Sequence, residues 1–150
     1  MFLHDLNLPD DAFLITNVGE LSKRKNQKVL IKALAKLKNE KVFLLICGEG
    51  SLHKYLLNLS RKLMVSRNVV FLGFRNDIDK ILNYSDVFAF SSKQEGLPVA
   101  LIEAISSGKP CVVSNIRGNS ELVRDGYNGF VVKRNNYHHF CKCFSNLINS

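Results

Sequence analysis

Six short apolar runs, each followed by a stretch with helical periodicity, constrain the fold of this 150-residue chain more than any other feature. Each run is apolar at consecutive positions, which is typical of parallel strands that are buried on both faces. The runs cover residues 13–18, 42–47, 69–72, 87–90, 111–114 and 130–132. This alternation predicts an α/β fold in a single domain, a Rossmann-like doubly wound parallel sheet of about six strands.

Helical periodicity fills the intervals between these runs. In residues 29–37, apolar side chains repeat at the spacing of one helix face. Ser51 and Asp77 are suited to cap the next two helices, and Pro98 is suited to the first turn of another. The further helices are expected at residues 52–63, 77–82, 98–106 and from 136 onward.

The organisation along the chain is simple. Residues 1–11 read as a lead-in or the remnant of a linker, and residues 12–150 as the folded domain. The first five residues lack the basic start and apolar core of a signal peptide. No apolar run approaches the roughly 20 residues needed to span a bilayer. We therefore expect a cytoplasmic protein.

The cysteines agree with a reducing compartment. Cys47 and Cys111 lie inside apolar runs and are expected to be buried thiols. The segment 138–143 contains two histidines and two cysteines, which suggests a metal site. On a helix, however, Cys141 and Cys143 point to opposite sides, which suits one ion poorly. No metal site is expected there.

The net charge of +8 is unevenly distributed. Residues 20–41 hold eight basic and two acidic side chains, and Lys28, Lys32 and Lys36 share one face of the first helix. Such a stretch could bind nucleic acid, an anionic membrane surface or the phosphates of a small ligand, or could be a solvated helix face. Aromatic residues are not interleaved with these lysines, and no nucleic-acid-binding motif is present, so no nucleic-acid partner is expected.

Two loops that follow strands carry features suited to phosphate. Right-handed crossovers place all strand-to-helix loops at one edge of the sheet, where ligands of such folds bind. Lys25 lies at the start of a helix, so its ammonium group and the helix N–H groups would converge. Gly96 lacks a Cβ, which lets the amides of Val99 and Ala100 approach an anion, whereas Pro98 has no N–H to offer.

Two carboxylates occupy the same region. Glu95 lies in the loop and Glu103 lies eight positions later, inside the following helix. A carboxylate accepts two hydrogen bonds, so either could hold the vicinal hydroxyls of a ribose or a hexose. The alternative for Glu103 is an ordinary carboxylate on a helix surface.

Other ligand-binding motifs are missing. The first loop offers only Gly19, so the G-x-G-x-x-G signature of nicotinamide enzymes is absent. The chain has no GKS or GKT phosphate loop and no G-x-S-x-G nucleophile elbow.

A set of short segments in fixed order carries a family resemblance. The most specific is Glu95-Gly96-Leu97-Pro98 through Glu103, an E-x7-E signature. The other segments are Val18-Gly19 with Lys25-Asn26, Gly48-Glu49-Gly50, residues 70–74, residues 85–88, Gly108-Lys109-Pro110, Gly118 with Glu121, and Asn128-Gly129. Together they resemble the C-terminal, donor-binding half of the GT-B glycosyltransferases of family GT4. The sequence is similar in particular to bacterial enzymes of capsule or exopolysaccharide synthesis.

The resemblance implies a retaining transfer of a hexose-type sugar from a UDP- or GDP-sugar to a glycan or lipid-linked acceptor, with no metal ion or other cofactor. It implies that Lys25 neutralises the diphosphate, Glu95 contacts the donor sugar and Glu103 the ribose. Phe74 and Arg75 would border the base. The implied catalytic residues are Lys25 and Glu95, and the implied donor-binding residues are Gly19, Arg24, Lys25, Phe74, Arg75, Gly96, Leu97, Pro98, Val99, Ala100 and Glu103.

The chain departs from the family pattern at three points. Many members carry Arg directly after the first-loop glycine, where this chain has Glu20, so Lys23 or Arg24 would have to supply the second cation. The N-terminal half, which binds the acceptor, is absent, and the C-terminal helix stops early. We therefore expect the isolated chain to be inactive. The resemblance further implies that the parent enzyme can associate peripherally with the inner face of the membrane.

Two alternatives remain open from the sequence. The chain could be a nucleotide-sugar-binding module with no transfer activity of its own, or a basic interaction protein that uses its lysine-rich helix. The sugar, the base and the acceptor are not indicated by the residues.

Overall fold

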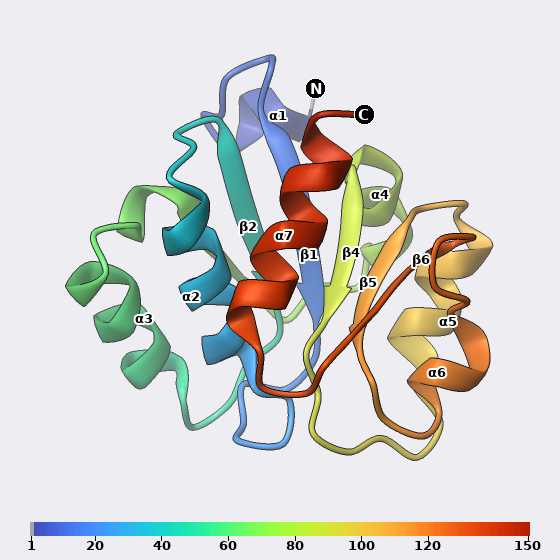
Figure 1. The fold of residues 1–150 in the computed structure, drawn as a ribbon. Helices are drawn as coiled ribbons and strands as arrows, with labels where there is room; N and C mark the ends of the chain where they lie inside the picture. Colours follow the sequence, from blue (N-terminus) through green and yellow to red (C-terminus); the bar gives the residue numbers. More distant parts are fainter. Residues whose placement is uncertain (1) are drawn as a thin grey trace.

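The computed structural model describes residues 2–150 and confirms the predicted α/β fold (Figure 1). Strands and helices alternate along the whole chain. The strands are β1 Phe13–Val18, β2 Val42–Cys47, β3 Val69–Gly73, β4 Val87–Phe90, β5 Cys111–Ser114 and β6 Gly129–Val132. The helices are α1 Phe2–Asp5, α2 Gln27–Leu37, α3 His53–Lys62, α4 Ile78–Tyr84, α5 Val99–Ser106, α6 Asn119–Leu122 and α7 Tyr137–Ile148, with a 3-10 turn η1 at Ser66–Asn68.

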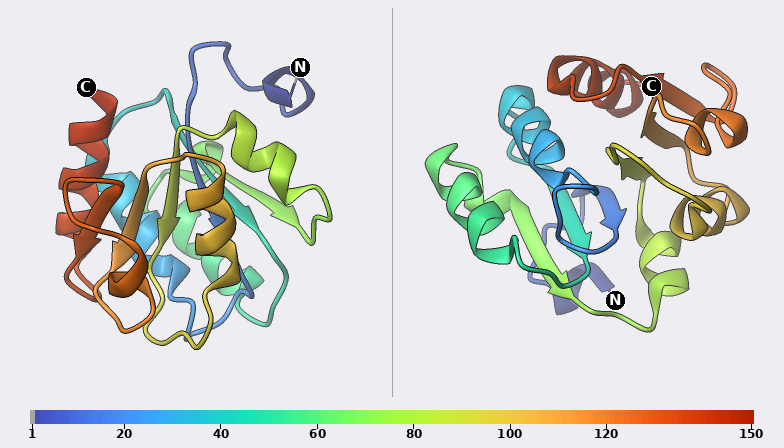
Figure 2. Two further views of the ribbon diagram at one scale, coloured as in Figure 1. Left: turned by 90° about the vertical axis from the view of Figure 1, so that its right-hand side faces the viewer. Right: turned by 90° about the horizontal axis from the view of Figure 1, so that it is seen from below.

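All six strands form one parallel sheet in the order β3-β2-β1-β4-β5-β6. The order reverses between β1 and β4, as in doubly wound nucleotide-binding sheets. Helices α2, α3 and α7 cover one face of the sheet and α4, α5 and α6 cover the other (Figure 2). The loop after β1 therefore lies beside the loop after β4.

The strand β2 explains why the apolar runs have no polar alternation. Successive side chains of a strand point to opposite faces, and here both faces are covered by helices. All six residues of β2 are buried. One set joins the core beneath α2, and the other set joins the core beneath α4; the sets are Val42, Leu44 and Ile46, and Phe43, Leu45 and Cys47.

The helix starts are less regular than the sequence predicts. The prediction of Ser51 as an N-cap is wrong, because Leu52 takes that position and its N–H donates to the Leu21 carbonyl at 3.2 Å. Asp77 does occupy the N-cap of α4, but it does not cap the helix with its side chain. Helices α1 and α6 are four residues long and were not predicted, because their sequences are too short to show periodicity.

The segment before β1 packs against the domain. Leu3, Leu6 and Leu8, each half-buried, lie against the core beneath α4, so the lead-in packs on the domain through these leucines and carries its own short helix. Met1 of the expected lead-in is outside the described residues.

All four cysteines are buried, free thiols. Burial raises the pKa of the Cys47 and Cys111 thiols to about 12 and that of Cys143 to about 11. The prediction that Cys141 and Cys143 point to opposite sides is wrong, because they flank the buried stripe of α7 and both pack into the core beneath it as small apolar side chains. Across residues 2–150, no helix combines the length and the apolar character that crossing a membrane requires.

Two glycines of the β5–β6 region give a stability test. A Cβ on Gly129 would lie 1.8 Å from the Cys111 carbonyl oxygen, because β6 starts against β5 there, whereas a Cβ on Gly126 would contact nothing within 4 Å. We expect Gly129→Ala to lower the free energy of unfolding by about 3 kcal/mol or more, since backbone must move. Gly126→Ala should cost only about 1 kcal/mol, for its positive φ. Urea denaturation measures both, and equal losses would contradict the structure.

Candidate functional site

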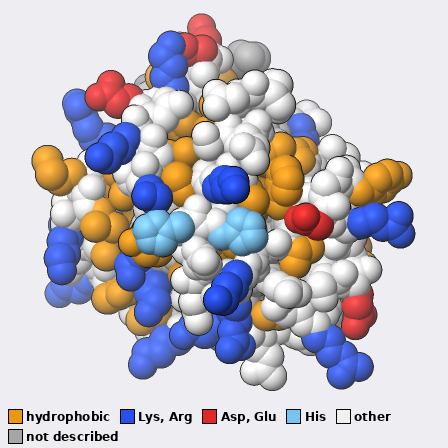
Figure 3. All heavy atoms as spheres, viewed as in Figure 1, with side chains coloured by type: hydrophobic (Ala, Val, Ile, Leu, Met, Phe, Trp, Pro, Cys, Tyr) orange, Lys and Arg blue, Asp and Glu red, His pale blue; other side chains and the backbone are white. Residues whose placement is uncertain are grey.

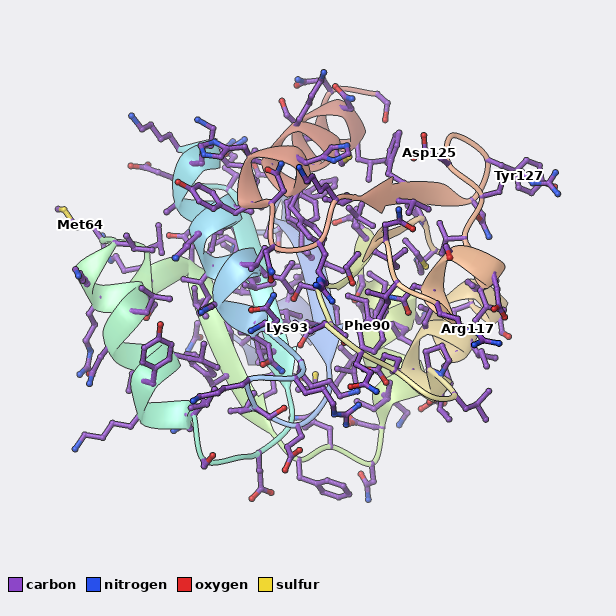
Figure 4. The ribbon with its side chains drawn as sticks, turned by 60° about the horizontal axis from the view of Figure 1, so that its bottom comes forward. Met64, Phe90, Lys93, Arg117, Asp125 and Tyr127 are labelled. Atoms are coloured by element: carbon purple, nitrogen blue, oxygen red, sulfur yellow. The ribbon has the colours of Figure 1, made fainter. Side chains whose placement is uncertain are left out.

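The site lies at the carboxyl edge of the sheet, where the strand order reverses between β1 and β4. Residues 19–26 follow β1 and residues 91–98 follow β4. The two loops are joined directly, since the Lys93 N–H donates to the Arg24 carbonyl at 2.8 Å. Figure 4 turns this edge forward and shows Phe90 and Lys93 near its middle. Crevices at such reversal points are the usual ligand sites of open α/β sheets.

An ion pair bridges the two loops. The Lys25 ammonium donates to Oε2 of Glu95 at 2.6 Å. The side chains are only 13% and 5% exposed, so the pair is largely removed from water. The sequence predicts both residues as members of the site, and the structure places them in direct contact.

Three neighbours position this pair. The hydroxyl of Ser92 donates to the same Glu95 oxygen at 2.8 Å. The Lys25 ammonium lies 5.0 Å from the ring centroid of Phe90, within cation–π range. Gly19 makes room for the lysine stem, because a Cβ there would lie 3.1 Å from Lys25 Cδ. Sequence reasoning missed Ser92 and Phe90. Phe90 is the last residue of β4 and Ser92 is the second residue after it, and this position at the carboxyl end of a strand is the signal that could have indicated them.

The second cation of the site is Arg24. Its Nη1 lies 3.6 Å from Oε1 of Glu95 and donates to the Gln94 carbonyl at 3.2 Å. Its side chain is 48% exposed, so it can turn toward a ligand. Lys23 instead lines a depression beside α3, on the other side of the loop. Glu20 is exposed, and its carbonyl accepts from the Gln27 amide group at 2.9 Å.

Buried hydroxyl and amide groups fix the loop after β4. The Ser91 hydroxyl donates to the Asn26 carbonyl at 2.9 Å, and the Ser114 hydroxyl donates to the Ser92 carbonyl at 2.6 Å. Asn119 in turn donates to the Ser114 carbonyl at 3.2 Å. The loop is therefore tied to α2 on one side and to the β5–α6 connection on the other.

Unpaired polar atoms also gather at this edge. Four buried side-chain oxygens have no hydrogen-bond partner within the described residues, and each costs stability. They belong to Asn17, Asn26, Gln27 and Asn119. All four residues lie in or beside the loops of the carboxyl edge, so this edge is not optimised for stability alone.

The start of α5 differs from the sequence prediction. Pro98 occupies the N-cap position, not the first turn, and its φ of −82° and ψ of 78° form an inverse γ-turn. The Val99 N–H accordingly donates to the Leu97 carbonyl at 2.9 Å. The Val99 amide is thus engaged, while Ala100 belongs to the first turn, whose N–H groups have no partner within a helix. Leu97 and Gly96 are exposed at the rim of the site.

The other residues predicted for the site lie around the Lys25–Glu95 pair. Glu103 is exposed on α5. Phe74 is 74% exposed, and with Arg75 it lines a depression of about 370 Å³ between the ends of β1, β2 and β3. Arg75 makes two hydrogen bonds to the Asp77 carboxylate, at 2.9 and 2.8 Å, and these hold the pKa of Asp77 below its usual value. The depression continues from Gly19, so it adjoins the Lys25 site.

The described residues contain no group of three or more His, Cys, Asp or Glu side chains placed to hold a metal ion. In the segment 138–143, Nδ1 of His139 accepts from the Lys133 N–H at 3.2 Å, and both cysteines face the core. Beside Glu95, the positive charge comes from Lys25 and Arg24.

Sheet order, reversal point and polar loops together define a Rossmann-like ligand-binding domain. A sequence model of the family described as glycosyl transferases group 1 matches residues 3–150. The UDP-Gal:alpha-D-GlcNAc-diphosphoundecaprenol alpha-1,3-galactosyltransferase of Escherichia coli is 38% identical over 141 residues, covering 90% of this chain and 36% of that protein. The putative glycosyltransferase EpsD of Bacillus subtilis is 37% identical over 126 residues, covering 83% of this chain and 33% of that protein.

Solved structures have the same fold as this chain. The crystal structure of Anabaena HepE in complex with UDP and glucose superposes with a TM-score of 0.93 at 28% identity, covering 99% of this chain and 42% of HepE. HepE has also been crystallised with UDP-glucose. The chain belongs to the glycosyl transferases group 1, family GT4, and corresponds to the C-terminal Rossmann-like domain of the GT-B fold. It spans about a third of the length of the curated relatives it matches.

The buried ion pair can be tested by a double-mutant cycle with Lys25→Met and Glu95→Gln. Removing one partner leaves the other charge buried and unpaired. The double variant should therefore lose less stability than the sum of the losses in the two single variants. We expect a coupling of about 1–2 kcal/mol in the free energy of unfolding.

The exposed pair of Lys41 and Asp11 supplies the control for that cycle, with side chains 67% and 58% exposed. Its cycle, with Lys41→Met and Asp11→Asn, should show no measurable coupling because water screens the charges. Additive effects at Lys25 and Glu95 would show that the bridge does not hold the two loops together.

Proposed function

We propose that this domain binds the nucleotide diphosphate sugar of a retaining glycosyltransferase that moves a hexose-type sugar to a glycan or lipid-linked acceptor in bacterial polysaccharide synthesis. The observation that carries the proposal is the Lys25–Glu95 pair at the β1/β4 reversal point. The complexes of HepE with UDP and UDP-glucose, and the UDP-Gal donor in the name of the Escherichia coli relative, favour UDP over GDP.

The site residues suit the charge that develops in this reaction. As the bond between sugar and phosphate breaks, negative charge grows on the leaving diphosphate, where fixed cations are most effective. Lys25 would neutralise this charge, and Arg24, half exposed beside it, would supply the second cation. The amide of Ala100 would add a hydrogen bond from the first turn of α5.

The carboxylates suit the hydroxyl groups of the donor. When Lys25 turns to the diphosphate, Glu95 is still held by the Ser92 hydroxyl and can accept from the donor sugar. Glu103, exposed on α5, would accept from the ribose hydroxyls. The base would enter the depression of about 370 Å³ beside Phe74 and Arg75.

The proposal needs no metal ion, since Lys25 and Arg24 provide the charge that balances the diphosphate. Donor binding should therefore survive chelation of divalent cations. The acceptor would bind to a further domain, because the chain spans only about a third of its curated relatives. In isolation the chain would bind the donor without transferring the sugar, and its full-length enzyme would act on the cytoplasmic side of the membrane.

Calorimetric titration with UDP in the presence of EDTA tests this function. Lys25→Ala removes a charge-assisted hydrogen bond and should weaken UDP binding about 30-fold. Arg24→Ala should weaken it about threefold, because its charge is half solvated. Lys36→Ala, an exposed lysine at the far end of α2, is the control and should leave the affinity unchanged. No binding of UDP or GDP, or equal losses in all three variants, would overturn the assignment.

A further inference from the structure

The depression that Lys23 lines is a cavity of about 410 Å³ between the starts of α2 and α3. It is lined from the β1–α2 loop, from the first turns of α2 and α3, and by Lys93, and we call it the α2–α3 cavity. Its volume is within the range of small-molecule pockets, about 300–1,000 Å³. Both helices start at the lower end of the view in Figure 1, which is the carboxyl edge of the sheet.

The cations at this cavity have no acidic partner. Lys23, Lys28 and Lys93 line it, and none of them forms an ion pair with a described residue. Lys28 and Lys93 are half-buried, and the described residues that line the cavity include no Asp or Glu. Figure 3 shows Lys and Arg side chains over the left and lower parts of this face, and Asp and Glu near its upper and right-hand borders. Like charges held together repel one another, and a bound anion would relieve that repulsion.

The first turns of two helices line the same cavity. Helix α2 has 11 residues and α3 has 10, and the first N–H groups of such helices have no partner within the helix. The N-cap residues are Asn26 and Leu52, and neither caps its helix with a side chain. Neither first turn contains an acidic residue. Both positive helix ends therefore lack the carboxylates that commonly compensate them, which suits a bound phosphate.

Two buried amides give an observation that is independent of charge. Asn26 and Gln27 line the cavity and are 2% and 1% exposed. Their nitrogens are satisfied, since Nδ2 of Asn26 donates to Oδ1 of Asn135 at 2.8 Å and Nε2 of Gln27 donates to the Glu20 carbonyl at 2.9 Å. Their oxygens have no partner among the described residues. A buried acceptor without a donor costs free energy that a hydroxyl or amine group of a ligand would recover.

The remaining wall of the cavity is apolar. Leu52 and Leu56 line it from the start of α3, together with Tyr55, whose side chain is 48% exposed. An exposed aromatic ring offers a flat apolar surface to the C–H groups of a sugar ring. An amine would be repelled by the three lysines, so hydroxyl groups are the donors that fit both the amides and the charge.

We propose that the α2–α3 cavity is a second ligand site of this domain and binds a soluble phosphorylated sugar. The phosphate would lie between Lys28 and Lys93, at the N–H groups of the helix starts. Hydroxyl groups would donate to the amide oxygens of Asn26 and Gln27, and the sugar ring would lie against Tyr55.

This site is separate from the donor site, although both use the β1–α2 loop. Neither Lys25 nor Glu95 lines the α2–α3 cavity. Lys93 does, and its N–H donates to the Arg24 carbonyl at 2.8 Å, which joins the loops after β1 and β4. A phosphate held by Lys23 and Lys93 would therefore tie the same two loops together as the ion pair does. The inference does not depend on the donor assignment, because binding is first measured with no nucleotide present.

Calorimetric titration of the chain with glucose 6-phosphate tests the site, with glucose and inorganic phosphate as partial probes. We expect glucose 6-phosphate to bind at least about tenfold more tightly than either partial probe, because it alone meets both the cations and the amides. Lys28→Gln combined with Lys93→Gln should weaken its binding about 30-fold, since each change removes a charge-assisted hydrogen bond. Tyr55→Ala should weaken it about fivefold, and Tyr55→Phe, which keeps the ring, should leave it unchanged.

The matched control removes the same charge from the same helix. Lys32→Gln combined with Lys36→Gln changes lysines of α2 that do not line the cavity and should alter the affinity by no more than about twofold. Circular dichroism confirms that each variant is folded. Equal losses in the two double variants would show attraction by net charge alone and would overturn the proposal.

Three further results would also overturn it. The first is no binding of glucose 6-phosphate at millimolar concentration. The second is equal affinity for glucose 6-phosphate and inorganic phosphate, which would remove the sugar from the site. The third is competition by UDP, which would place glucose 6-phosphate in the donor site. Failure of UDP to bind at all would overturn the proposed function and leave this result standing.

Discussion

The ion pair between Lys25 and Glu95 is the interaction on which the carboxyl edge of this domain depends. The two residues are 70 positions apart in the chain and meet because β1 and β4 are neighbours in the sheet. The pair is largely buried, and charges interact more strongly where water is excluded. The same surroundings that strengthen the Lys25–Glu95 pair would also strengthen a contact between Lys25 and a charged ligand. In the proposed function, an arriving diphosphate would compete with Glu95 for Lys25, and the released carboxylate would then be available to a sugar hydroxyl.

The rest of the sheet edge is compatible with the proposed exchange. Gly19 gives the Lys25 side chain its space, and Gly48 lets the end of β2 approach β1, since a Cβ there would lie 1.9 Å from the Gly19 carbonyl oxygen. Buried serines after β4 fix the loop that carries Glu95. In the proposed function, donor binding would move the Lys25 and Glu95 side chains and leave the loops in place, because hydrogen bonds already hold both loops.

Much of the fold follows from the sequence, and the reasons for the exceptions are physical. The apolar runs locate all six strands to within one residue, because strands buried on both faces must be apolar throughout. The extra residues Gly73 and Gly129 carry no apolar signal. The N-cap at Ser51 fails because contacts of Leu52 with the neighbouring loop, which are tertiary, set the start of α3.

The candidate site also contains residues that the sequence predicts and residues that it does not. Lys25 and Glu95 could each be selected from chemistry and spacing within a loop. Their direct contact could not, because it depends on which strands are neighbours. Phe90 and Ser92 were missed for a related reason: an aromatic residue in a buried strand and a serine in a loop have many structural roles, and only the three-dimensional arrangement assigns these two to Lys25 and Glu95.

The central claim is that the diphosphate of the donor replaces Glu95 as the partner of Lys25. The most direct measurement is a crystal structure of this chain with UDP. The account predicts a phosphate oxygen about 2.8 Å from Lys25 Nζ, beside the first turn of α5, with Glu95 moved off the lysine and uracil in the depression at Phe74. A diphosphate bound elsewhere, such as among Lys23, Lys28 and Lys93, with the Lys25–Glu95 pair intact, would contradict it.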